Sequence, residues 1–115
     1  MDIFVTRHAI ERYRQRLFDF KASDESISEI LREIALKGKA ISIRRDNSNN
    51  CLEKKYKGVS IVSIHNHKKI VVITCLGEVA YRNWVKSNNI VPPISLGVLK
   101  KYRETQHQFL DLTGK

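Results

Sequence analysis

Hydrophobic residues near the start of the chain recur with the period of an α-helix. A β-prone stretch, DIFVT, comes first and predicts a short strand or an extended arm over 2–6. Thr6 is a good N-cap residue, and the following pattern predicts a helix over 7–17. One side of that helix carries an apolar line at positions i, i+3 and i+7, formed by Ile10, Tyr13 and Leu17. The helix is therefore amphipathic, with a separate polar face.

A second segment with the helical period predicts a helix over 24–37. Ser26 and Glu29 fit a capping box at its start, although Ser23 can serve as the cap instead. Its expected core face consists of Ile27, Ile30, Leu31 and Ile34. Gly38 stands where a C-cap glycine is common, so it marks the predicted end of the helix.

The period then changes from 3.6 to 2, which predicts strands. Polar turn compositions, such as DNSNN at 46–50 and NHKK at 66–69, separate them. The expected strands cover 39–45, 51–56, 59–66 and 69–77, and the last is apolar on both faces. Three short links in succession predict an antiparallel meander.

Helical patterning returns after Gly77, with Ala80 and Trp84 on one predicted face and Pro92-Pro93 as the stop. Ser95 is the expected cap of a last helix reaching about residue 109, whose face is Val98, Leu99, Tyr102 and Phe109. The predicted fold class is α+β: two N-terminal helices packed on an antiparallel sheet of about four strands, followed by C-terminal helices. At 115 residues we expect one domain, 1–115, with a core over 1–77 and a helical extension over 78–115.

The net charge of +9 changes this picture, because it is concentrated in one segment. Residues 37–69 carry nine lysines and arginines against two acids. A localised basic surface favours a polyanion, with RNA first and DNA second. An anionic membrane or an acidic protein surface, antitoxin-like or from a host, is the next option, and a charge that only keeps the protein soluble is the alternative. No apolar run reaches the length of about 18 residues that a membrane span needs, and we expect no membrane partner.

Cysteine is sparse, and the N-terminus lacks a secretory h-region. We therefore expect a cytoplasmic protein in which Cys51 and Cys75 are reduced thiols, with a disulfide left open.

His8, Arg12 and Arg16 fall at i, i+4 and i+8 of the first predicted helix and form one stripe. A neutral imidazole can exchange a proton near pH 7, and guanidinium groups match phosphate oxygens. The stripe predicts acid–base chemistry or phosphate binding on RNA, whose 2′-hydroxyl supplies the nucleophile without a metal. The alternative is a solvated face that means nothing for function.

The same residues carry a family resemblance. A short N-terminal segment, a helix with H-A-x-x-R-x-x-x-R spacing in which the residue after alanine is apolar, a second helix ending at glycine, and strands closing on VVITCLG resemble the small RelE/BrnT-type toxin-related proteins. That family has the barnase–EndoU–colicin–RelE ribonuclease fold. The likeness covers about residues 3–77. It implies site positions at His8, Arg12 and Arg16, with Thr74 in support.

A basic hairpin supplies the expected nucleic-acid platform: Arg44, Arg45, Lys54, Lys55, Tyr56 and Lys57. Side chains alternate between the faces of a strand, so no single face holds all the cations. Tyr56 can stack on a base. The alternative is an edge hairpin that lysines protect from aggregation.

His65 and His67 stand two residues apart, but no further ligand is near them in sequence. We therefore expect a polar turn, no metal site and no cofactor. The predicted function is nucleic-acid binding, preferentially of RNA, with metal-independent endoribonuclease activity of toxin type as its enzymatic form. The alternatives are a binding module without catalysis, and a phage or host-modulating inhibitor that docks on an acidic protein surface.

Overall fold

The computed structural model describes residues 2–46, 49–66, 68–90 and 96–112. Its contacts divide the chain into two compact units, Met1–Val79 and Ala80–Lys115. Each unit is described by itself below.

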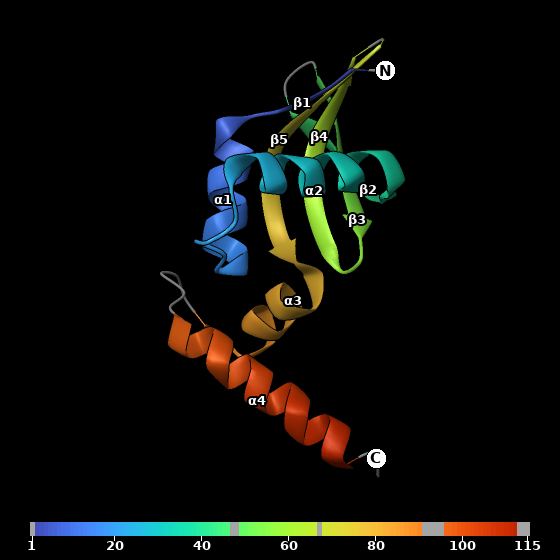
Figure 1. Ribbon diagram of the computed structural model, residues 1–115. Coiled ribbons are helices and arrows are strands. Elements are labelled where there is room, and N and C mark those ends of the chain that lie inside the picture. Colours follow the sequence, from blue (N-terminus) through green and yellow to red (C-terminus); the bar gives the residue numbers. More distant parts are fainter. Residues whose placement is uncertain (1, 47–48, 67, 91–95, 113–115) are drawn as a thin grey trace. The chain divides into compact units, whose positions relative to one another are not determined.

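The first unit is built on a five-stranded mixed sheet (Figure 1). Its strands are β1 (Asp2–Val5), β2 (Lys39–Asp46), β3 (Asn49–Tyr56), β4 (Val59–Asn66) and β5 (Lys69–Glu78), in the order β1-β5-β4-β3-β2. The predicted antiparallel meander is confirmed for β2 to β5. The prediction of about four antiparallel strands was wrong in one respect, because β1 adds a fifth strand parallel to β5. Many residues separate β1 from β5, so no hairpin forces them to be antiparallel.

Two helices pack against this sheet, α1 (Arg7–Leu17) and α2 (Asp24–Lys37). In Figure 1, α2 crosses in front of β4 and β5, and α1 lies beside β5. Thr6 caps α1 as predicted, since its hydroxyl accepts a bond from the Ala9 N–H at 3.1 Å. Ser23 rather than the Ser26 box caps α2, accepting from the Ser26 N–H at 3.1 Å.

Gly38 follows α2 in extended rather than left-handed backbone, with φ −67°. Glycine is needed there because of space: a Cβ would collide with the carbonyl oxygen of Ile34. A different reason holds in the turn between β3 and β4. There Lys57 and Gly58 both have positive φ, 50° and 85°, as in the two-residue turns that suit twisted hairpins.

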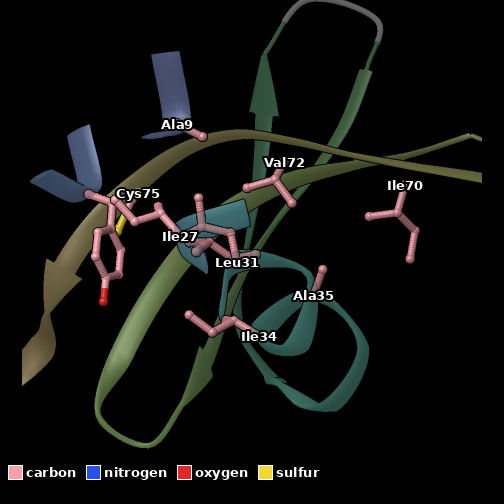
Figure 2. Packing of buried hydrophobic residues seen from close by; sticks show 10 residues of the cluster. Ala9, Ile27, Leu31, Ile34, Ala35, Ile70, Val72 and Cys75 are labelled. Atoms are coloured by element: carbon pink, nitrogen blue, oxygen red, sulfur yellow. The ribbon is translucent and has the colours of Figure 1, made fainter. Parts of the chain in front are cut away.

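The core of the first unit lies between the helices and the sheet (Figure 2). Its buried members are Ala9, Tyr13, Ile27, Leu31, Ile34, Ala35, Ile61, Ile70, Val72 and Cys75. Most of the predicted core face of α2 is confirmed, but Ile30 is 37% exposed. The 3.6-residue period places Ile30 at the edge of that face, and Ala35 takes the inner position instead.

The second unit contains α4 (Leu96–Leu112) and most of α3 (Val79–Ser87). The predicted inner face of α3 was wrong by one position: Ala80 is exposed, whereas Tyr81 and Val85 are buried. The Tyr81 ring packs edge-on against Tyr102 of α4, at 5.0 Å between centroids. Aromatic contacts therefore hold the two helices together.

Pro92, Pro93 and Ser95 lie outside the described residues, as does the side chain of Phe109. No described helix combines the length and apolarity that crossing a bilayer requires.

Candidate nucleic-acid interface

Helix α1 lies along the part of β5 that β1 does not reach. The pairing of β1 with β5 ends at Val5 and Val72. Beyond it, the Thr6 hydroxyl donates to the Val72 carbonyl at 2.9 Å, and the Arg16 Nη1 donates to the Cys75 carbonyl at 2.7 Å. The Val72 carbonyl also accepts from the Thr6 backbone N–H at 3.2 Å, so Thr6 fastens the start of α1 to β5, and Arg16 fastens its last turn.

Gly77 allows this close approach. Its φ is +91°, and a Cβ there would lie 3.1 Å from the Cβ of Arg16. A larger residue would strain the backbone and press on α1. The final strand and the first helix are thus fitted to one another at this glycine.

The three residues of the predicted stripe on α1 do not share the same partners. His8 is exposed, and its Nε2 accepts a bond from the Arg12 Nε at 3.4 Å. Arg12 also donates to the Gln15 Oε1 at 2.9 Å. Arg16 turns instead to the Cys75 carbonyl. The stripe is not three repelling cations in a row, since Arg16 is anchored on β5 and His8 accepts from Arg12.

The His8 contact sets the imidazole beside a guanidinium on an exposed helix face. A histidine in such a position can exchange a proton with a ligand, and a guanidinium can hold phosphate oxygens. The structure therefore brings together His8 and Arg12, but gives Arg16 a separate partner.

Thr74, the fourth predicted site residue, lies on the other face of the sheet. It is the register partner of Val62, the neighbour of the core residue Ile61. Because side chains alternate, Thr74 and Val62 point away from the helix-covered face. The supporting role that the resemblance implies for Thr74 stays a prediction.

The two adjacent lysines of β3, Lys54 and Lys55, lie on opposite faces of the sheet. Lys54 faces the helices, and its Nζ donates to the Ala35 carbonyl in the last turn of α2 at 2.8 Å. Burial lowers the pKa of the Lys54 ammonium. A cation at the C-terminus of a helix satisfies a carbonyl that lacks an intrahelical partner. Lys54 thus serves the fold and is not displayed for a ligand.

Lys55 points to the other face and is exposed. Its register partner in the neighbouring strand is Lys39, which is exposed as well. Among the ion pairs of the described residues, none involves either lysine. Glu53 lies on the same face but is 6% exposed, and it accepts a bond from the Ser42 hydroxyl at 3.4 Å. Two exposed lysine side chains therefore leave the sheet from positions directly opposite one another on neighbouring strands.

The remaining hairpin residues are placed as follows. Tyr56 packs against the core, and the Lys57 Nζ lies 5.3 Å from the centre of its ring. Much of the aromatic surface predicted to stack on a base is thus covered. Arg44 and Arg45 belong to β2, and their side chains lie outside the described residues.

The histidine pair and the cysteines add no metal centre to the described part of the chain. His65 contacts the Ser63 hydroxyl at 3.2 Å, and His67 lies outside the described residues. No group of three potential ligands gathers within the described ranges. Cys51 and Cys75 are both buried thiols rather than a disulfide. They point to opposite faces of the sheet, which explains why they do not pair.

Two residues of this interface were missed by sequence reasoning. Lys39 was not singled out because only the register sets it beside Lys55. Thr6 was recognised as a cap, but its bond to Val72 joins residues 66 positions apart and leaves no local signal.

Comparisons with protein-family models, with curated proteins and with solved structures found no match to this chain. The resemblance to RelE/BrnT-type proteins therefore stays a prediction.

Proposed function

We propose that the protein binds nucleic acid, RNA in preference to DNA, through the exposed lysines of β2 and β3. The observation that carries the proposal is the side-by-side placement of Lys39 and Lys55. Lys57 follows Lys55 in the adjoining turn and is also exposed. A phosphodiester backbone is a regular array of negative charges, so closely spaced ammonium groups suit it. A cytoplasmic location belongs to the same proposal.

The repulsion between the charges of Lys39 and Lys55 supports a binding function for these two lysines. Like charges directly opposite one another on neighbouring strands are destabilising. In the described structure neither lysine gains an ion pair in return. The fold therefore keeps an unfavourable contact on its surface, and an anionic ligand would turn that contact into a favourable one. Protection of the sheet edge from aggregation is the competing explanation.

Salt dependence of binding tests the proposal. We expect the affinity for a labelled single-stranded RNA to fall steeply with salt. The variant Lys39→Gln with Lys55→Gln should lessen the log–log slope by about 1.4, because each lost phosphate contact removes roughly 0.7 on a single strand. Lys21→Gln with Arg32→Gln is the matched control. It removes the same charge from exposed positions on the α1–α2 loop and α2.

The control should retain the slope of the unaltered protein. Equal losses in both variants would mean that only the net charge matters, and would remove these lysines from the proposal. If no RNA binds even at low ionic strength, the protein does not act on nucleic acid, and docking on an acidic protein surface becomes the better account of the charge.

A second function, RNA cleavage, is favoured by one specific observation: the exposed His8 imidazole beside the Arg12 guanidinium. In this proposal His8 takes the proton of a ribose 2′-hydroxyl. The freed oxygen attacks the adjacent phosphorus, the bond from phosphorus to the 5′-oxygen breaks, and the leaving 5′-oxygen takes a proton from water, to which His8 later returns its own. Arg12 steadies the charge on the phosphate oxygens. DNA lacks the 2′-hydroxyl, so the same site cannot cleave it this way.

Incubation of RNA and of the matching DNA with the protein in EDTA tests cleavage. We expect RNA alone to be cut, leaving 2′,3′-cyclic phosphate ends, and His8→Ala to abolish cutting. Gln15→Ala is the control on the same helix face. If His8→Ala cuts as well as the unaltered protein, His8 is not the base. If no RNA is cut while the salt-dependent binding persists, the protein is a binding module.

A further inference from the structure

The outer edge of β2 carries features of an unfilled binding site. β2 is the last strand of the sheet and spans eight residues, whereas β1 at the other end spans four. Within the described residues, no strand lies beyond β2. An edge of this length presents backbone N–H and C=O groups with which an added strand can pair.

Apolar side chains on and just before this edge add a second, independent feature. Ile43 is 73% exposed and Ile41 46% exposed, both on β2. Leu36, close before β2 in the last turn of α2, is 63% exposed. The inner strands β4 and β5 leave no isoleucine or valine in the exposed class, whereas β2 leaves two isoleucines exposed. An added strand would cover at least Ile43 while it formed its backbone bonds.

Charge decides what kind of strand fits. β2 carries Lys39, Arg44 and Arg45 against the single acid Asp46, and Lys37 precedes it. A second copy of β2 would bring three cations and one acid of its own to this basic edge, so its charge matches the edge poorly. A strand with carboxylates between its apolar residues would meet the same cations favourably. The charge of the edge thus favours an acidic segment over a second copy.

We infer that the β2 edge binds an extended acidic peptide segment of another protein by β-strand addition, with Ile43 as its apolar anchor. This inference does not rest on the proposed RNA function. Lys39 belongs to both surfaces, so a bound segment and RNA would compete for that lysine.

Peptide binding to the full chain tests the inference. The probe is a fluorescent eight-residue peptide in which valine alternates with glutamate. We expect it to bind the protein and to protect β2 amides from hydrogen exchange. A peptide of the same pattern with lysine for glutamate should not bind. Ile43→Glu should weaken binding by about tenfold or more, since it removes a buried isoleucine contact and adds repulsion.

Two controls make each outcome decisive. Phe20→Glu introduces the same charge at another exposed apolar residue, in the α1–α2 loop, and should change affinity by less than about twofold. A probe N-methylated at every residue should fail to bind, because it can donate no backbone hydrogen bond to the β2 edge. No binding by the acidic probe, equal weakening by the two glutamate variants, or normal binding of the methylated probe would each overturn the inference. A dimer that Ile43→Glu dissociates would show that the occupant is a second copy.

Discussion

The two ends of the sheet differ in which elements lie next to their last strands. On one side, β1 pairs with the first part of β5, and α1 covers the remainder through Thr6 and Arg16. On the other side, β2 has only β3 as a neighbour, and Ile41 and Ile43 remain exposed within the described structure. The part of β5 that extends beyond β1 is thus covered by α1, and we call it the closed edge. The outer side of β2, which spans eight residues and has no neighbouring strand among the described residues, is the open edge.

The difference separates residues that serve stability from residues available for binding. Cations occur at both edges, but their surroundings are unlike. Arg16 donates to a backbone carbonyl and is held against Gly77. Lys39 and Lys55 face one another with no ion pair among the described residues. A basic residue is therefore a candidate for ligand binding only where the fold does not already use its charge.

The largest expected effect compares an isoleucine inside the sheet with one at the open edge. Ile70 lies on β5 between β1 and β4 and is 3% exposed, so Ile70→Ala should cost about 2–5 kcal/mol of unfolding free energy. Ile43→Ala at the open edge should cost less than about 1 kcal/mol, mainly through strand propensity. Urea unfolding at constant m-value measures both. Similar costs would mean that Ile43 is covered in the native protein and that the edge is not open.

A smaller effect is expected when the two arginines of α1 are compared. Arg16→Gln removes the bond to the Cys75 carbonyl at the closed edge and should cost about 1–3 kcal/mol. Arg12→Gln removes only surface contacts with His8 and Gln15 and should cost about 0.5 kcal/mol or less. Thermal unfolding of the two variants measures the contrast. Equal, small costs would show that the bond from Arg16 to the Cys75 carbonyl contributes no more to stability than the surface contacts of Arg12.

The sequence predicted most elements of the first unit because periodicity and capping are local properties. The α2 helix and the meander of β2 to β5 follow directly from them. The parallel pairing of β1 did not, because strand direction depends on a partner 66 or more residues away. Local alternation shows that Lys54 and Lys55 face opposite ways, but only tertiary packing determines which of them meets α2.

The candidate site was less predictable than the fold. The spacing of His8, Arg12 and Arg16 is correct for one helix face, and His8 does contact Arg12. The spacing cannot show that a carbonyl of β5 lies within reach of Arg16. The same limit applies to Lys39, whose partner is set by the register of two strands rather than by its own segment.

The smallest expected effect lies between the two edges, at His65 on β4. Burial lowers the pKa of His65 below its ordinary value of 6.5, and the charge of Lys54 lowers it further. The folded protein therefore favours the neutral ring, whereas the unfolded chain takes up a proton first as the pH falls. The resulting stabilisation is complete above pH 6.5 and is lost as the pH falls through the lower pKa of the folded state.

Replacing His65 by Gln should reduce the loss of stability between about pH 7 and pH 5, because no imidazole then gains a proton on unfolding. Urea unfolding at several pH values measures the effect, with His8→Gln on the exposed face of α1 as the control. Lys54→Met should raise the His65 pKa in an NMR titration, since it removes the second cause of the shift. An unchanged His65 pKa in that variant would mean that burial alone accounts for the shift. A His65→Gln protein as acid-sensitive as the original would place the acid-sensitive group elsewhere.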